Sequence, residues 1–233
     1  MNIKTKLTVI VPCFNEINTI TKIIKLIRKQ KLNLQLIVVD DFSRDGTREK
    51  LKKFIKTSEK LILHKKNLGK GAAIRTAKKY IKGKIVIIQD ADLEYSPNDY
   101  AKLIKPILMK KTNIVYGSRV LNKDRYFGNS FSSEFRVFAN HVLTIISNLI
   151  NNQNLTDAHT CYKVIKTDIF NKIKLNENGF SFCPEITTKI SLKNEKIIEV
   201  PISYKGRSYD EGKKINFYDG FNALKTLIKY RFF

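Results

Sequence analysis

The chain has 233 residues, of which 42% are hydrophobic, so it is long enough for one domain with a substantial core. Its 44 lysine and arginine residues outnumber its 21 acidic residues, and the formal charge of +23 favours a polyanionic partner: nucleic acid, an anionic membrane surface or a phosphorylated substrate. Cys13, Cys161 and Cys183 are odd in number and lack metal-ligand spacing. This argues against a disulfide scaffold or a zinc site and predicts a reducing compartment.

The first half of the chain alternates between predicted strands and predicted helices. Strands are expected at residues 7–11, 34–39 and 61–64, in the apolar part of 84–94, and at 114–116. A helix with an apolar stripe over residues 20–27 follows the first strand, another runs from Ala72 to about Ile81, and a third starts at Pro97. This alternation is typical of an α/β sheet. No signal peptide is expected, because the first apolar run ends at the polar residues Asn15 and Glu16.

The stretch 84–94 combines a buried strand with two closely spaced acids. Its β-branched run indicates a strand covered on both faces, as in a parallel sheet, and it stops at Asp90-Ala91-Asp92. Ligands of such sheets collect at the carboxyl ends of the strands. There the oxygens of Asp90 and Asp92 could converge on one divalent cation that holds two phosphate groups of a nucleotide. The alternative is an ordinary turn rich in aspartate.

Further polar residues follow other predicted strands. Asp41 follows the second strand, and Arg119 follows the strand at 114–116. Together with Asp90 and Asp92 they indicate a nucleotide site. The first strand is not followed by Gly-x-Gly-x-x-Gly, and the sequence contains no phosphate-binding P-loop motif, which disfavours a dehydrogenase or a kinase.

Motifs along nearly the whole chain, in the same order, resemble those of family 2 glycosyltransferases of the GT-A fold. In the first half these are VIVPCFNE (9–16), VDD (39–41) with SRDGT (43–47), NLGKG (67–71), DAD (90–92) and GSR (117–119). The later ones are DAHTCYK (157–163), PEIT (184–187) and EVPISY (199–204), followed by Arg207 and EGKK (211–214). More narrowly, the chain is similar to the polyprenyl-phosphate sugar transferases related to dolichol-phosphate mannose synthase, in a bacterial branch without transmembrane helices.

This resemblance implies one GT-A domain over residues 1–233, with a mostly parallel sheet flanked by helices. The nucleotide-sugar half is expected at 1–120, the acceptor half at 121–215 and a C-terminal amphipathic helix at an interface at 216–233. The nucleotide sugar would be bound by Pro12, Asn15, Glu16, Asp41, Gly69, Lys70 and Asp90. Two alternatives stay open: Glu16 is also a favourable acid for a first helical turn, and the glycine-rich loop is also a plain entry into a helix.

By the same resemblance, Asp90, Asp92 and Glu94 would bind Mg²⁺ or Mn²⁺ around the diphosphate, with Asp92 near the reaction. Arg119 would be catalytic and would grip the acceptor phosphate, since a guanidinium fork matches phosphate oxygens. Further contacts to this phosphate are expected from Arg136, Arg207 and Lys213, and a solvated surface is the alternative for Arg136 and Lys213. Ser132 stands where some relatives place a second arginine.

A phosphate acceptor is already anionic, so it can attack the anomeric carbon without a strong base. Positioning and charge neutralisation would then provide most of the catalysis, in a single inverting displacement. A hydroxyl acceptor would need a base, for which Asp157 and Glu185 are the available acids. Either acid could instead bind a backbone group or orient an arginine, and His159 is given no role.

Two segments have the composition of helices that lie in a membrane interface. The tail from Phe221 to Phe233 mixes large apolar residues with Lys225, Lys229 and Arg231, which suits anionic lipids. The segment around Phe131, Phe135, Phe138 and Val142 is the second such segment, and the uncharged stretch 137–156 that overlaps it has too many polar residues to cross a bilayer. Packing in the core is the alternative for both. The expected location is peripheral, on the inner face of the cytoplasmic membrane.

The leading hypothesis is therefore a metal-dependent enzyme that transfers a hexose from a nucleotide sugar, of the GDP-mannose or UDP-glucose type, to a polyprenyl phosphate. Transfer to a hydroxyl of a glycan or soluble acceptor is the enzymatic alternative. A nucleic-acid-binding protein explains only the charge and leaves the acids after the strands unexplained, so nucleic acid is not expected as a partner. A catalytically silent nucleotide-binding protein is a further alternative.

Overall fold

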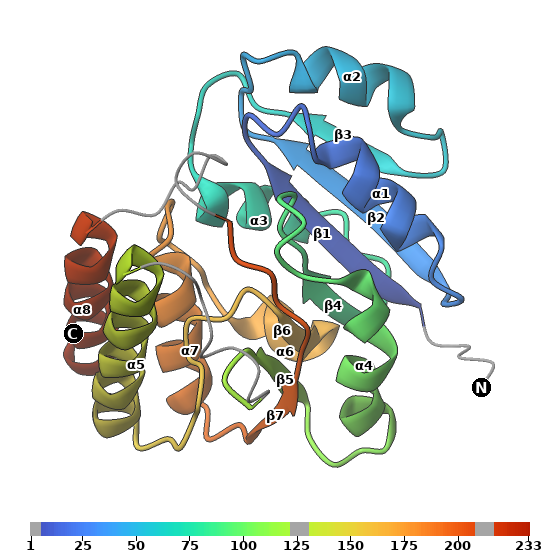
Figure 1. The fold of residues 1–233 in the computed structure, drawn as a ribbon. Helices are drawn as coiled ribbons and strands as arrows, with labels where there is room; N and C mark the ends of the chain where they lie inside the picture. The colour runs from blue at the N-terminus through green and yellow to red at the C-terminus, as the bar shows by residue number, and fades with distance from the viewer. Residues whose placement is uncertain (1–5, 122–130, 208–216) are drawn as a thin grey trace.

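The computed structural model describes residues 6–121, 131–207 and 217–233, with side chains at 6–121, 138–207 and 218–233. A seven-stranded sheet in the order β3-β2-β1-β4-β6-β5-β7 forms its centre (Figure 1). The strands are β1 (Leu7–Cys13), β2 (Leu34–Asp40), β3 (Lys60–Leu63), β4 (Ile85–Ile88), β5 (Ile114–Ser118), β6 (Lys163–Lys166) and β7 (Ile197–Pro201). Only β6 runs against its neighbours. The predicted α/β class with a mostly parallel sheet is confirmed.

Helices cover both faces of this sheet. They are α1 (Ile20–Arg28), α2 (Thr47–Phe54), α3 (Lys70–Lys78), α4 (Tyr100–Leu108), α5 (Phe131–Asn151), α6 (Thr167–Lys172), α7 (Phe182–Ser191) and α8 (Phe217–Phe232), with a short 3₁₀ helix η1 (Pro97–Asp99) before α4. Figure 1 shows α1 and α4 on one face and α3 and α6 on the other. The apolar stripe of α1 is buried, as its spacing predicts.

The central strands are apolar on both faces because helices cover both. Every residue of β4 is buried, and β1 is buried except at Pro12. Three strands run further than the sequence indicates: β1 continues through Pro12 and Cys13, β2 through Asp40 and β5 through Ser118. In β1 and β2 the added residues continue the parallel ladder, because Pro12 pairs with Val39 and Cys13 pairs with Asp40.

Strand β6 is not predicted by the strand–helix alternation. It enters between β4 and β5, so these two parallel strands are both paired with an antiparallel neighbour from much later in the chain. Strand β7 then extends the sheet beyond β5. Because β1, β2, β4 and β5 are oriented alike, their carboxyl ends meet at one edge, where the predicted site residues follow them.

Helices α5 and α8 lie side by side at one end of the molecule, next to α7 (Figure 1). The C-terminal helix expected at 216–233 is therefore present as α8. Within the described ranges, no helix combines the length and apolar character needed to cross a membrane.

Candidate active site

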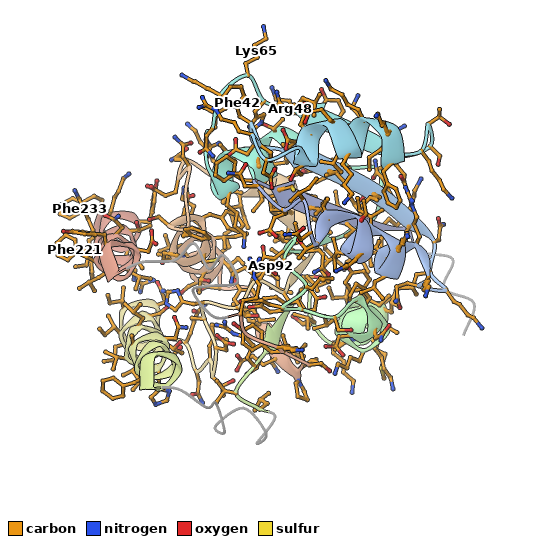
Figure 2. All side chains as sticks on the ribbon, turned by 45° about the horizontal axis from the view of Figure 1, so that its top comes forward. Phe42, Arg48, Lys65, Asp92, Phe221 and Phe233 are labelled. Carbon is orange, nitrogen blue, oxygen red and sulfur yellow. The ribbon has the colours of Figure 1, made fainter. Side chains whose placement is uncertain are left out.

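The loop after β4 presents Asp90 and Asp92 on a buried support. Behind it, the hydroxyls of Tyr100 and Tyr162 donate to Gln89 Oε1 at 2.7 and 2.6 Å, and Gln89 Nε2 donates to the Asp90 carbonyl at 2.9 Å. The chain then reverses at Leu93, whose φ is 67°. A fixed turn of this kind holds the two carboxylates at the edge of the sheet, and Figure 2 shows Asp92 near the centre of the molecule.

Asp90 is paired with the first residue of α3. Lys70 Nζ lies 2.5 Å from Asp90 Oδ1, and both side chains are largely buried. Burial alone would raise the pKa of Asp90, but the charge of Lys70, supported by Arg119, outweighs it and lowers that pKa. For Lys70 burial is likewise overcome by Asp90, so the pKa of the ammonium lies well above its ordinary value. The pair is therefore ionised on both sides.

Asp92 has a different electrostatic environment. Burial, followed by the negative charges of Asp90 and Glu94, raises its pKa to about 7, although Arg207 acts in the opposite direction. Arg207 Nη2 lies 3.2 Å from Asp92 Oδ2 and 3.1 Å from Glu16 Oε1. One guanidinium thus bridges acids from the loops after β1 and β4.

Glu94 anchors the segment that carries Arg207, residues 202–207, which we call the strap. Tyr204 donates its hydroxyl to Glu94 Oε2 at 2.9 Å, and the Arg207 amide donates to Glu94 Oε1 at 2.8 Å. The Lys205 amide donates to the Glu94 carbonyl at 2.9 Å. Both carboxylate oxygens of Glu94 therefore hold the strap in this structure, and a role in metal binding stays a prediction.

The loops after β1 and β2 are joined by short hydrogen bonds. Asn15, with φ of 51°, donates its amide to Ser43 Oγ at 2.8 Å and accepts from the Arg44 amide at 2.9 Å. The Glu16 amide donates to Thr47 Oγ1 at 2.9 Å. Asn15 and Glu16 are thus brought beside the loop that follows Asp41, whereas Pro12 lies within β1. Their role in binding the nucleotide stays a prediction.

Asp41 shapes the loop that leads into α3. Its Oδ1 accepts from the Leu68 amide at 2.8 Å and lies 2.7 Å from His64 Nδ1, and its Oδ2 accepts from the Gly69 amide at 2.6 Å. The other ring nitrogen of His64 lies 3.0 Å from Thr76 Oγ1 on α3. Sequence reasoning misses this buried His64, because nothing in its spacing from Asp41 indicates the contact.

Gly69 and Gly71 allow another segment of the chain, residues 177–178, to approach their backbone closely. A Cβ on either glycine would collide with the backbone carbonyl of Asn178 or Glu177, respectively. The Asn178 carbonyl accepts from the Ala72 amide at 3.1 Å, and Arg75 donates to the Glu177 carbonyl and to the Asn178 side chain. The first turn of α3 is therefore covered by the segment before α7, and Lys70 is the part of this loop that reaches the carboxylates.

Arg119 follows β5 and is held by Asp157. Its Nε and Nη2 donate to the two carboxylate oxygens at 2.7 and 2.8 Å, and its amide donates to Asp157 Oδ2 at 3.0 Å. Glu199 on β7 accepts from the amides of Thr156 and Asp157 at 2.7 and 3.0 Å and fixes that loop. Asp157 therefore orients an arginine, which is the alternative to a role as a base that the sequence left open. The guanidinium also lies 5.2 Å from the ring of Tyr204.

Of the remaining residues considered from the sequence, the structure describes the side chains of Glu185 and His159. Glu185 is buried and accepts from the amides of Asn176 and Glu177 at 2.6 and 2.9 Å, which is the backbone-binding alternative. The pKa of His159 is lowered to about 4 by burial and then by Lys163. Lys213 and the side chain of Arg136 lie outside the described residues.

The donor set fits a divalent cation bound together with a ligand. Among the described residues, no group of three or more His, Cys, Asp or Glu side chains is placed to hold a metal ion. However, Asp90 and Asp92 lie together after β4, and the raised pKa of Asp92 reflects burial and then the negative charges of Asp90 and Glu94, which a cation would offset. Hard oxygen donors suit Mg²⁺ or Mn²⁺ when phosphate oxygens and water supply the remaining ligands.

Solved structures of similar fold are glycosyltransferases. Glucosyl-3-phosphoglycerate synthase from Mycobacterium tuberculosis, in complex with Mn²⁺, UDP and phosphoglyceric acid, superposes with a TM-score of 0.71 at 17% identity, over 98% of this chain and 79% of its own. The complex of that enzyme with Mg²⁺ and UDP gives a TM-score of 0.69 at 16% identity, over 98% and 80%. At this identity the likeness establishes the GT-A fold.

Curated relatives are similar over most of this chain. An uncharacterized protein of Methanocaldococcus jannaschii is 29% identical over 99% of this chain and 94% of its own length. The dolichol-phosphate mannosyltransferase of Pyrococcus furiosus is 27% identical over 89% of this chain, which spans 59% of that longer protein. A dolichyl-phosphate beta-glucosyltransferase of Trichomonas vaginalis is 26% identical over 97% of this chain and 73% of its own length.

The family model described as glycosyl transferase family 2 matches residues 8–174. This range includes the loops after β1, β2, β4 and β5, and therefore Glu16, Lys70, Asp90 and Asp92, whereas Arg207 lies beyond it. The predicted resemblance is confirmed, and the chain belongs to glycosyl transferase family 2, as an enzyme of the GT-A fold.

Proposed function

We propose that this enzyme transfers a hexose from a nucleotide sugar to a polyprenyl phosphate at a membrane surface, with Mg²⁺ or Mn²⁺ and with inversion at the anomeric carbon. The observation that carries the proposal is the meeting of Asp90 and Asp92 with Lys70, Arg207 and Glu16 at one edge of the sheet. The named relatives act on dolichyl phosphate, which supports the acceptor class. GDP-mannose and UDP-glucose are both candidate donors.

On the donor side, Asp90 and Asp92 would hold the metal, which supplies Lewis-acid stabilisation of the departing diphosphate. Lys70 keeps Asp90 ionised and in place. Asn15 and Glu16 lie in the linked loops after β1 and β2 and would contact the nucleoside, with Pro12 supporting their loop from the end of β1. Asp41 and Gly69, joined by a hydrogen bond, shape the wall leading to Lys70.

On the acceptor side, Arg119 is the best-placed group for the phosphate among the described residues after β5. Asp157 fixes two of its nitrogens, so the guanidinium has a single orientation. A fixed fork costs little entropy when an anion binds, and it stays charged at all physiological pH values. Arg136, Arg207 and Lys213 are proposed as further contacts to the acceptor phosphate.

A phosphate acceptor also agrees with the hydrogen bonds of the two candidate bases. Asp157 orients Arg119, and Glu185 binds two backbone amides and Lys189. Carboxylate oxygens that are occupied by such contacts are not placed to take a proton from an acceptor, which disfavours activation of a hydroxyl. A soluble acceptor remains the second candidate, because the structural neighbour was solved with phosphoglyceric acid.

The surface of α5 and α8 supports a membrane location. On α5 the buried side chains include Thr144, Ser147 and Asn151, whereas Phe138, Ile145 and Leu149 are exposed. On α8 the exposed side chains include Tyr218, Phe221, Ile228, Phe232 and Phe233, and Figure 2 shows Phe221 and Phe233 at the outer edge of the molecule. Large apolar residues thus face outward on two adjacent helices, which marks an interaction surface.

An anionic bilayer is the occupant that fits this surface. Lys225 and Arg231 lie on the same helix as the exposed aromatic residues, so cationic groups adjoin the apolar face. Basic residues beside aromatic ones are typical of helices that lie in a lipid interface. The acceptor would be delivered from that bilayer, which we place at the inner face of the cytoplasmic membrane.

The test is turnover of a panel of GDP- and UDP-sugars with Mg²⁺ or Mn²⁺, with and without a short polyprenyl phosphate. We expect transfer only with lipid phosphate and metal, and loss of transfer in Asp92→Asn. Asp168→Asn is the matched control, because Asp168 is exposed on α6, away from the site. Transfer to phosphoglycerate or to a glycan hydroxyl would favour the second candidate. Absence of transfer across the panel by a folded enzyme would contradict the proposal.

A further inference from the structure

Among the described residues, Lys70 forms an ion pair with Asp90 and Arg207 with Asp92, and these two cations are held very differently. Lys70 belongs to α3, and the first turn of that helix is covered by the backbone of Glu177 and Asn178. Arg207 belongs to the strap, which follows β7 in the chain and lies against the loop after β4. Lys70 therefore approaches Asp90 from a rigid element, whereas Arg207 approaches Asp92 from a loop.

The contacts of Arg207 also differ in geometry from those of Lys70. Lys70 Nζ contacts Asp90 at 2.5 Å, but Arg207 Nη2 is shared between Asp92 at 3.2 Å and Glu16 at 3.1 Å. In addition, Arg207 Nη1 donates to the second carboxylate oxygen of Glu16, Oε2, at 3.2 Å. The guanidinium thus pairs with Glu16 through both terminal nitrogens and reaches Asp92 with one of them. Losing Asp92 leaves the pair with Glu16 intact.

We infer that Arg207 is the exchangeable counter-ion of the carboxylate site, and that a divalent cation binding Asp92 displaces it. The inference rests on the proposed metal-dependent function. Asp92 Oδ2 is the atom that Arg207 contacts, and a metal ion and a guanidinium cannot both neutralise one carboxylate at this range without repelling each other. Arg207 then keeps its contacts with Glu16, and the nitrogen freed from Asp92 becomes available to the acceptor phosphate.

The anchoring of the strap allows this exchange without unfolding. The Ser203 amide donates to Asp99 Oδ2 at 2.8 Å, and Tyr204 and Lys205 are held by Glu94. These contacts do not involve Asp92, so they persist when Arg207 leaves it. Movement is needed only in the long arginine side chain, which has several rotatable bonds.

The experiment measures binding of Mn²⁺ alone to the full chain, by electron paramagnetic resonance of the free ion, in the absence of nucleotide. We expect Arg207→Ala to bind Mn²⁺ about three- to tenfold more tightly than the native enzyme, because a competing cation is removed. Lys205→Ala is the matched control. It removes the same charge from the same strap, its side chain is exposed, and it should change the affinity less than twofold, about the size of a screened surface charge.

A second measurement does not depend on a variant. Hydrogen exchange of native peptides covering 202–207 should stay unchanged on addition of Mn²⁺, because the amides of Ser203, Lys205 and Arg207 keep their acceptors. Faster exchange there would show that the whole strap detaches, which contradicts displacement of the Arg207 side chain alone. Unchanged or weaker Mn²⁺ binding by Arg207→Ala, or equal gains in both variants, would overturn the inference while leaving the proposed function intact. Failure of every form to bind Mn²⁺ even with GDP or UDP present would instead refute the metal dependence, and the inference with it.

Discussion

Arg119 and Asp157 form a buried pair whose members depend on each other. The two side chains are 7% and 2% exposed and share bidentate hydrogen bonds. Arg119→Ala leaves a buried carboxylate without its partner, so we expect a loss of about 3–5 kcal/mol in the free energy of unfolding. A double change, Arg119→Met with Asp157→Leu, should lose much less, although transfer should be absent in both. Urea unfolding measures this, and equal losses in the single and double variants would contradict it.

Asp92 is predicted to destabilise the metal-free protein at neutral pH. Its folded pKa of about 7 exceeds the unfolded value of about 3.9, so between these values the folded state retains a proton that the unfolded state has lost. The free energy of unfolding therefore falls as the pH rises through this window. In EDTA, Asp92→Asn should raise Tm at pH 8 by a few degrees, roughly, and the difference should shrink at pH 5.

Thermal unfolding at the two pH values checks this prediction. Asp168→Asn is again the control, because its side chain is exposed and it should show no comparable pH-dependent gain. A variant Asp92→Asn that is less stable than the native enzyme at pH 8 would show that the contact with Arg207 outweighs the crowding of carboxylates.

At the scale of elements, the contact of α3 with the segment before α7 positions Lys70. A methyl group on Gly71 would meet the Glu177 carbonyl, whereas one on Gly179 meets nothing within 4 Å. We expect Gly71→Ala to cost about 1–3 kcal/mol and to weaken nucleotide binding, because the start of α3 must shift. Gly179→Ala should be neutral in both respects. Calorimetric titration with GDP and UDP and urea unfolding measure the two effects.

The α5 and α8 surface makes a prediction about lipid binding. Leu149 and Phe221 are 78% and 67% exposed, so replacing both with serine should leave the fold intact. Binding to vesicles of anionic phospholipid should fall at least about tenfold, since each buried large side chain contributes about 1.5–3 kcal/mol. Met109→Ser, at an exposed site after α4, is the control. Unchanged cosedimentation of the double variant would contradict the proposed surface.

The sequence predicts elements better than it predicts contacts between them. The first five strands follow from short apolar runs, and α1 follows from its apolar stripe, because both kinds of element depend on a local pattern. Strand β6 is missed because its four residues, Lys163–Lys166, carry no long apolar run, and only pairing with β4 and β5 makes them a strand. Similarly, α8 is expected as a helix, but its outward-facing aromatic residues become visible only when α5 and α7 are in place.

The site shows the same division. Asp90 and Asp92 are predictable because they end a buried strand, and the resemblance supplies the roles of the other motif residues. Three other features of the site cannot be predicted from the sequence. They are the bridge from Arg207 to Glu16 and Asp92, the contact of His64 with Asp41, and the covering of α3 by Glu177 and Asn178. These contacts join residues far apart in the chain, and no spacing rule encodes them.

At the scale of the whole molecule, the sheet is completed in an order that differs from the order of the chain. Strands β1 to β4 can pair among themselves, but the strand partners of β5 are β6 and β7, which come much later. During synthesis on the ribosome, β4 therefore presents a bare edge, and β5 stays without any strand partner, until residues 163–201 have emerged. Unpaired edges of this kind promote aggregation. The yield of soluble protein in a cell should consequently depend on preventing nascent chains from associating with one another. Slower translation of the residues after β5 should lower the soluble fraction of the protein.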